Sequence, residues 1–187
     1  MRKKVLNAVD SIASAASGVP SESIHYAPMN TSLTTTLLLP LLIGVVAGLR
    51  AVTAPAAVSW AARIGWLNLA PTSLAFLGYA FTPWVLTALA LGELVNDKLP
   101  STPSRTVPPQ FGARLVSGGL SGAAIGAAHG GLFIGLVAGI VGAVIGTLGG
   151  RTCRAQLARA FGSDRPAAFT EDAVAVVSAF LIMVALP

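Results

Sequence analysis

Long apolar runs without a charge alternate with short polar segments along this sequence. Each run approaches the length of about 20 residues that a helix needs to cross the hydrocarbon core of a bilayer. The runs are Thr34 to Leu49, Leu74 to Leu91, Leu115 to Ala128, Leu132 to Gly149 and Ala173 to Leu186. The pattern predicts an all-α fold, a polytopic transmembrane helical bundle of about five spans that occupies residues 32–187.

The segment AVTAPAAVSWAA follows the first run and is only partly apolar. Pro55 lies within it and predicts a break or a re-entrant half-helix in residues 50–63. Irregular backbone at membrane depth is tolerated only where protein or a watery cavity surrounds it. A full additional span here would put basic clusters on both sides of the membrane, so the sequence favours about five spans over six.

The first 31 residues have a different pattern. Val5, Val9 and Ile12 share one helical face behind the basic start MRKK, which suits a short amphipathic helix on an anionic membrane surface. A basic tail that only sets orientation is the alternative. Asp10 interrupts the apolar stretch too early for the core of a cleaved secretory signal.

Composition supports a membrane protein. The 187 residues are 54% hydrophobic and only 10% charged, with a mean hydropathy of +0.76. A soluble domain usually carries about 25% charged residues. The net charge is +5, but the basic residues lie between apolar runs and do not form a stripe interleaved with aromatic residues. The basic charge therefore points to membrane orientation, with membrane lipids as partners and no nucleic acid.

The basic residues form three clusters that fall on one side of a five-span arrangement. They are Arg2, Lys3 and Lys4, then Lys98, Arg105 and Arg114, then Arg151, Arg154, Arg159 and Arg165. The other side receives only Arg63 and the turn at His129. Because basic loops stay in the cytoplasm, we expect a cytoplasmic N-terminus and a C-terminus outside, which is the periplasm if the membrane is a bacterial inner membrane.

The third and fourth runs are rich in glycine at a helical spacing. The spaced glycines are Gly118, Gly122, Gly126 and Gly130, then Gly131, Gly135 and Gly139, then Gly142, Gly146 and Gly150. Such a stripe lets a neighbouring helix backbone approach closely inside a membrane. The partner is either another helix of this chain or a second copy in a homo-oligomer, and a glycine-lined pore is a third alternative.

Six charged residues form the candidate site. Glu93 and Asp97 are four residues apart and share a face if the second span continues as a helix. Both acids would lie at a helix C-terminus, where the macrodipole disfavours anions, so other groups must stabilise them. The candidate partners on the same side are Arg50, Lys98, Arg105 and Arg114.

The cluster supports two interpretations. The acids either form ion pairs between helices, or they make a site for an ion, a proton or an anionic lipid head group, because charges at a membrane edge are costly. Arg50 either snorkels to the interface or pairs with Glu93 or Asp97. Glu171 and Asp172 come just before the fifth run, where helix capping and the macrodipole explain two acids.

No catalytic residue, cofactor or metal site is expected. Cys153 is the single cysteine and His129 lies in a glycine turn, and neither has partners at metal-ligand spacing. The favoured function is an inner-membrane protein that handles a small solute, ion or lipid head group at the charged cluster. The alternative is a non-transporting structural or accessory subunit, and a membrane-embedded lipid enzyme comes third.

Two stretches resemble a known family. GLRAVTAPAAVSWAAR and LALGELVNDKLPSTPSRTVPPQFGARLVSGGLSGAAIG are similar to the bacterial membrane proteins of domain of unknown function 4126. The most specific match is Glu93, Asp97, Lys98 and Pro100 followed by Arg114, and Gly48-Leu49-Arg50 is the second. The resemblance begins near Ser32 and implies a small multi-pass membrane fold without an assigned activity.

The sequence also suggests a weak inverted repeat. GVVAGLRAVTAPAAVSWAARIG and GAVIGTLGGRTCRAQLARAFG each contain a glycine-rich run, an arginine and a closing Arg-apolar-Gly pattern. Their spacing along the chain predicts opposite orientations in the membrane, as in inverted-repeat transporters.

Overall fold

The computed structural model describes residues 33–96 and 107–187, and all regular structure in these ranges is helical. The α-helices are α3 (Leu39–Leu49), α4 (Thr53–Arg63), α5 (Thr82–Asn96), α6 (Pro108–Ala128), α7 (Leu132–Phe161) and α8 (Asp164–Val184). A π-helical segment, η1 (Thr34–Leu38), leads into α3, and a 3-10 turn, η2 (Ala75–Gly78), precedes α5. The all-α prediction is confirmed. The predicted N-terminal amphipathic segment lies outside the described residues.

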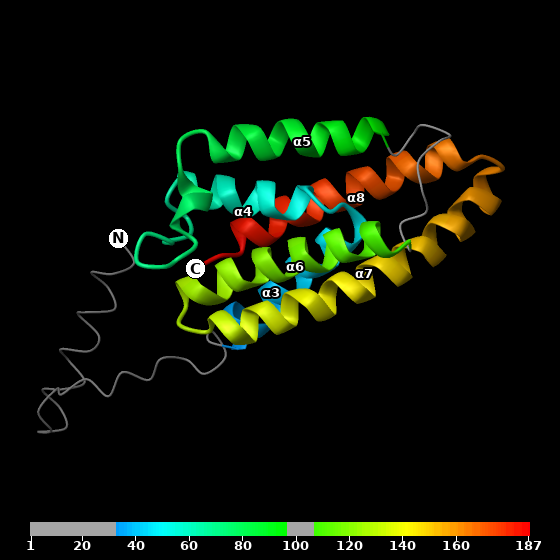
Figure 1. The fold of residues 1–187 in the computed structure, drawn as a ribbon. Coiled ribbons are helices and arrows are strands. Elements are labelled where there is room, and N and C mark those ends of the chain that lie inside the picture. Colours follow the sequence, from blue (N-terminus) through cyan, green and yellow to red (C-terminus); the bar gives the residue numbers. More distant parts are fainter. Residues whose placement is uncertain (1–32, 97–106) are drawn as a thin grey trace, which may run out of the picture.

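Consecutive helices from α3 to α8 run in opposite directions (Figure 1). Thr36 of η1 lies beside Gly131 in the α6–α7 turn, and Figure 1 places the C-terminus at this same end, which we call the turn end. An odd number of passes would have left the two ends of the described fold on opposite sides. The count of five spans is therefore not confirmed. Residues 50–63, where a break or a re-entrant half-helix was expected, contain the break and α4, whose 11 residues make about 16 Å of helix at about 1.5 Å per residue.

The helix boundaries differ from the apolar runs except in the first. That run, residues 34–49, matches η1 and α3. The second was expected to begin at Leu74, but α5 begins at Thr82, because residues 70–81 form turns and η2. Helix α6 begins with Pro108, seven residues before the apolar run, since proline suits the first helical position.

Helices α7 and α8 also extend beyond the apolar runs. Helix α7 continues through polar residues to Phe161 and ends where Gly162 adopts φ +67°, a left-handed conformation that favours glycine. Helix α8 begins at Asp164, nine residues before the predicted start at Ala173. The polar part of the α7–α8 hairpin projects past the other helices (Figure 1).

Glycines bring α3, α6 and α7 into backbone contact. A Cβ atom placed on Gly139 of α7 would lie 2.1 Å from the carbonyl oxygen of Gly118 on α6. A Cβ on Gly142 would lie 2.1 Å from the carbonyl oxygen of Leu41 on α3. Both distances are too short for any real side chain, so the glycine stripe packs against helices of the same chain, the first of the alternatives predicted from the sequence.

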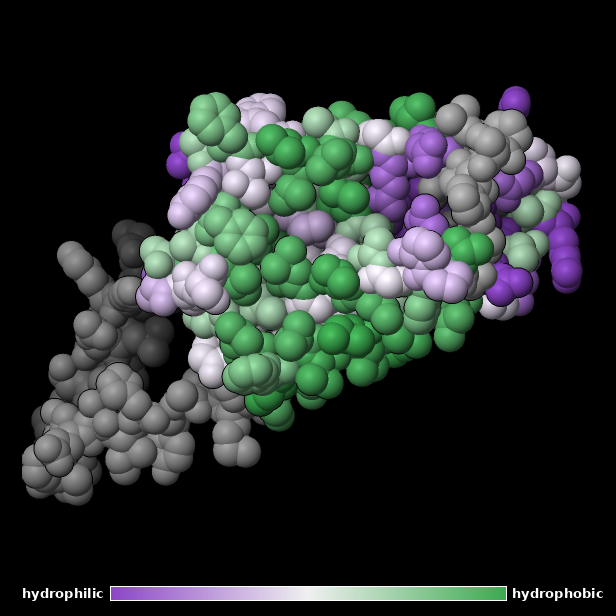
Figure 2. All heavy atoms as spheres, viewed as in Figure 1, coloured by the Kyte–Doolittle hydropathy of each residue, from purple (hydrophilic) through white to green (hydrophobic). Residues whose placement is uncertain are grey.

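Apolar side chains cover much of the outer surface. Figure 2 shows hydrophobic residues over the middle of the bundle and hydrophilic residues gathered towards the end opposite the turn end. The exposed apolar residues of α7 and α8 include Val137, Val141, Ile145, Val174, Val177 and Leu181. In the described part of the chain, α7 and α8 are long and apolar enough to cross a membrane, and residues 34–49 form a shorter apolar helix. These features indicate membrane association.

The inverted repeat predicted from the sequence is wrong. Its first copy folds as α3, a break and α4, whereas the second lies in the unbroken helix α7. Helices α3 and α7 also run in the same direction (Figure 1). The shared glycines serve close helix packing in both segments, and they do not reflect a common fold.

Candidate functional site: a charged cluster at a helix break

The site is built around the break between α3 and α4. Helix α3 ends at Leu49, α4 begins at Thr53, and Arg50 between them has an extended backbone with φ −138° and ψ 108°. Pro55 does not cause this break, contrary to the expectation from the sequence. It is the third residue of α4, where its missing N–H would have had no helical partner. We call the end of the bundle that holds this break the charged end.

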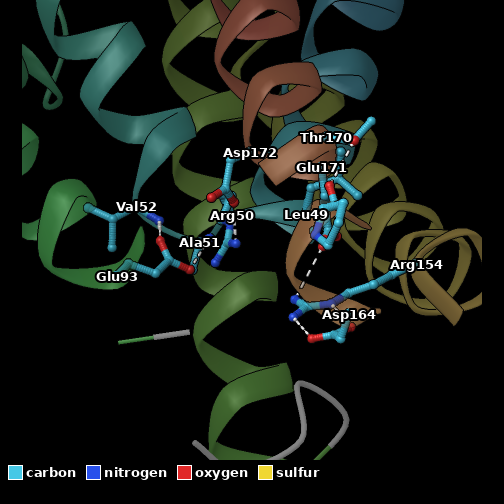
Figure 3. Close-up of polar contacts among 12 residues, drawn as sticks. Leu49, Arg50, Ala51, Val52, Glu93, Arg154, Asp164, Thr170, Glu171 and Asp172 are labelled. Atoms are coloured by element: carbon cyan, nitrogen blue, oxygen red, sulfur yellow. Dashed lines mark hydrogen bonds and ion pairs between the residues drawn. The ribbon is translucent and has the colours of Figure 1, made fainter. Parts of the chain in front are cut away.

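The carboxylate of Glu93 caps the start of α4 from the neighbouring helix α5. Its Oε1 accepts a hydrogen bond from the backbone N–H of Ala51 at 2.8 Å, and its Oε2 accepts one from Val52 at 2.8 Å (Figure 3). The N-terminus of a helix carries partial positive charge and N–H groups without helical partners. Glu93 therefore places a negative charge where α4 stabilises one.

Arg114 of α6 binds the other side of the break, the C-terminus of α3. Its Nη1 donates to the carbonyl oxygens of Gly48 and Leu49, both at 2.7 Å. These carbonyls belong to the negative end of a helix, where cations are stabilising. The Nη2 atom of Arg114 also lies 3.9 Å from Oε1 of Glu93. One guanidinium and one carboxylate thus bind backbone groups on the two sides of the break and lie beside each other, while Ser117 and Thr147 donate to the carbonyl oxygens of Ala51 and Gly48.

Arg50 is fully buried and pairs with α8. Its Nη2 donates to Oδ1 of Asp172, and the Arg50 side chain is 0% exposed. Snorkelling, one of the two predicted environments of Arg50, is therefore wrong. Among the described residues, Arg50 meets the carboxylate of Asp172, 122 residues away in the sequence.

A second ion pair system lies farther along α7 and α8. Arg154 donates from Nε and Nη2 to the two carboxylate oxygens of Asp164, at 3.0 and 2.7 Å. Its Nη1 lies 3.5 Å from Oε2 of Glu171, which is almost fully buried (Figure 3). The bidentate contact between Arg154 and Asp164 joins the end of α7 to the start of α8.

The structure brings three of the six predicted site residues together. Arg50, Glu93 and Arg114 all lie at the helix break. Asp97, Lys98 and Arg105 lie outside the described residues. The described structure therefore places half of the predicted cluster, and the cluster as a whole stays a prediction.

Asp172 and Glu171 are the site residues that the sequence analysis missed. Both were explained as caps of the fifth span, but α8 begins at Asp164, so they lie two turns inside it and are buried. The signal that reveals the true start is GSDRP. Gly162 ends α7, Ser163 is the N-cap and Pro166 lies in the first turn of α8.

The cluster brings the guanidinium groups of Arg50 and Arg114 together with the carboxylates of Glu93 and Asp172. No three His, Cys, Asp and Glu side chains are placed to hold a metal within residues 33–96 and 107–187. Cys153 is exposed, and the carbonyl oxygen of Ile125 lies 2.9 Å from Nδ1 of His129, where it accepts a hydrogen bond when that nitrogen carries the proton. Both lie outside the cluster.

Comparison of the chain with family models, with curated proteins and with solved structures gave no match. The resemblance to domain of unknown function 4126 stays a prediction from the motifs around Glu93 and Arg50.

Proposed function

We propose that this chain is an integral membrane protein that handles a small solute, ion or lipid head group at the cluster of Arg50, Glu93, Arg114 and Asp172. The observation that carries the proposal is the broken helix pair α3–α4, with both backbone ends held by ionised side chains from other helices. In membrane proteins, discontinuous helices direct their termini at solute sites. Ionised groups inside a membrane are costly and often mark functional sites, and a buried ion pair by itself adds little stability.

The arginine distribution supports an orientation with the charged end in the cytoplasm. The arginines at or beyond that end are Arg50, Arg114, Arg151, Arg154, Arg159 and Arg165, against Arg63 at the other end of α4. In place of about five spans, we propose antiparallel passes from α3 to α8, of which α4 is a partial one. This arrangement keeps the C-terminus periplasmic, as the sequence predicts. A cytoplasmic N-terminus depends on residues 1–32, and it stays a prediction together with homo-oligomer formation.

A structural or accessory role is the second candidate, and one observation favours it. Glu93 accepts hydrogen bonds from two backbone N–H groups, and Arg114 donates to two carbonyl oxygens, so both residues already have protein partners that stabilise the fold. On this alternative, the charges only fix the geometry of the break and no solute changes their state.

Ligand-dependent stability separates the two candidates. The purified protein in detergent is unfolded thermally with each of four probes: sodium chloride, potassium chloride, sodium phosphate and short-chain phosphatidylglycerol. A ligand of the folded state at about 100 times its Kd adds about 2.7 kcal/mol of stability. We expect at least one probe to raise the Tm of the parent protein in a saturable manner, and Glu93→Gln to lose this response.

Asp164→Asn is the matched control, because it removes one carboxylate charge from an exposed position near the same end. It should keep the response of the parent. A parent that no probe stabilises, or a response that Glu93→Gln and Asp164→Asn change equally, would favour the structural role.

A further inference from the structure

Helix α5 is loosely attached to the bundle. Of its 15 residues only Pro83 and Ala90 are buried. Within the described residues it packs against α4 and η2, and no other element makes a comparable contact with it. Figure 1 shows α5 along the outer side of α4, away from α6 and α7. The position of α5 therefore depends on few interactions.

Different contacts hold the two ends of α5. Near the turn end, Nε1 of Trp60 donates to Oγ1 of Thr87 at 3.0 Å, and the rings of Trp60 and Trp84 meet edge to face with centroids 5.0 Å apart. At the charged end, Glu93 accepts the N–H groups of Ala51 and Val52. One attachment is an aromatic and apolar contact, whereas the other includes the charged carboxylate of Glu93.

An apolar groove separates α5 from α8. It has a volume of about 410 Å³ and is lined by residues of α4, α5 and α8, among them Leu91 and Leu94 on one side and Val176 and Phe180 on the other. The groove means that α5 and α8 do not interlock along this side. Within the described residues, α5 is held mainly through α4 and η2 and not through α8.

We propose that Glu93 is a latch and that α5 is a hinged helix, with its pivot at Trp60, Trp84 and Thr87. When the Glu93 carboxylate leaves the N-terminus of α4, the charged end of α5 swings away from α8 and the groove between them widens. The movement exposes the N–H groups of Ala51 and Val52 together with the neighbouring guanidinium of Arg114. A hinge at one end and a charge-dependent contact at the other are the parts of a domain-closure switch.

This device goes beyond the proposed function, because the latch can open whether or not a solute binds. The two ideas fail separately: the latch is judged from distances in the absence of any probe, and solute handling from the stability response described above.

The test measures distances between pairs of spin labels by pulsed electron paramagnetic resonance. All variants carry Cys153→Ser, which removes the native thiol. One pair, Val95→Cys with Val174→Cys, reports on the charged end of α5 and α8, and both positions are exposed. The second pair, Phe81→Cys with Val184→Cys, reports on the turn end, and both are exposed as well. Each pair is measured with Glu93, with Glu93→Ala and with Glu93→Gln.

We expect Glu93→Ala to lengthen or broaden the charged-end distance by about one helix turn, ~5 Å. The turn-end distance should stay as in the parent. Glu93→Gln should give an intermediate distribution, because its amide oxygen can accept one N–H while its amide nitrogen cannot accept the other. Leu89→Ala, an exposed change on the same helix, is the control and should leave both distances unchanged.

Unchanged distances in both Glu93 variants would overturn the latch. So would equal lengthening at the two ends, which would mean that α5 detaches without a hinge. If Glu93→Ala fails to fold, Glu93→Gln decides alone: a charged-end distance identical to that of the parent rejects the proposal.

Discussion

The ion pair between Arg50 and Asp172 gives the sharpest prediction for stability. Asp172→Asn keeps the size of the side chain but removes the charge opposite Arg50, whose side chain is 0% exposed. Removing one partner of a buried ion pair lowers the free energy of unfolding by about 3–5 kcal/mol, because the other charge stays buried without compensation. The Asp172 side chain is 11% exposed, so solvent screens the pair only slightly. We therefore expect Asp172→Asn to lower the free energy of unfolding by about 3 kcal/mol or more.

The assay is unfolding of the purified protein in mixed micelles, followed by circular dichroism of the helices as denaturing detergent increases. Asp164→Asn is the control, since it also removes a carboxylate but from a side chain that is 64% exposed. Exposed ion pairs contribute about 0–1 kcal/mol, and the new asparagine keeps one oxygen that can accept from Arg154, so the control should cost less than Asp172→Asn. Equal effects of Asp172→Asn and Asp164→Asn would refute the argument from burial.

A double variant tests whether the pair itself is responsible. Replacing a buried ion pair by apolar residues of similar volume is often neutral or stabilising. Arg50→Met combined with Asp172→Leu should therefore be more stable than either single variant. A double variant as unstable as the sum of the single changes would show that the two residues act independently.

Two further predictions use the same unfolding assay. Gly139→Ala should destabilise the fold by about 1–3 kcal/mol, because the added Cβ would lie 2.1 Å from the carbonyl oxygen of Gly118. Gly149→Ala, with nothing within 4 Å of its Cβ, should be neutral or stabilising by about 0.5–1 kcal/mol. Effects of the same sign and size in the two variants would contradict close backbone packing. Thr87→Val removes the acceptor of the Trp60 indole and should lower stability by about 0.5–1.5 kcal/mol with a change in tryptophan fluorescence, and an unchanged spectrum would contradict that contact.

The sequence predicted the elements that depend on local pattern. The apolar run at residues 34–49 matched η1 and α3, because a charge at Arg50 ends both the run and the helix. The glycine spacing predicted close packing, because a helix face without side chains lets any neighbouring backbone approach closely. Which helix is the partner depends on the path of the chain, and the glycine spacing gives no information on that path.

The contacts of the site could not be predicted, because they join residues far apart. The neighbours considered for Glu93 were charged residues, but its acceptor oxygens meet backbone N–H groups that only a helix break exposes. Asp172 was assigned to a helix start from its place before an apolar run. The capping signal at Ser163 moves that start by two turns and turns Asp172 into a buried partner of Arg50.

Labelling of the single native cysteine tests the central claim, that the bundle spans the membrane with its charged end in the cytoplasm. Cys153 is exposed on α7 between Arg151 and Arg154, at that end. In bacterial spheroplasts, a membrane-impermeant maleimide should label Cys153 only after the membrane is permeabilised. In a Cys153→Ser background, Pro187→Cys at the C-terminus should be labelled without permeabilisation. Labelling of Cys153 in intact spheroplasts, or protection of both positions, would contradict the account.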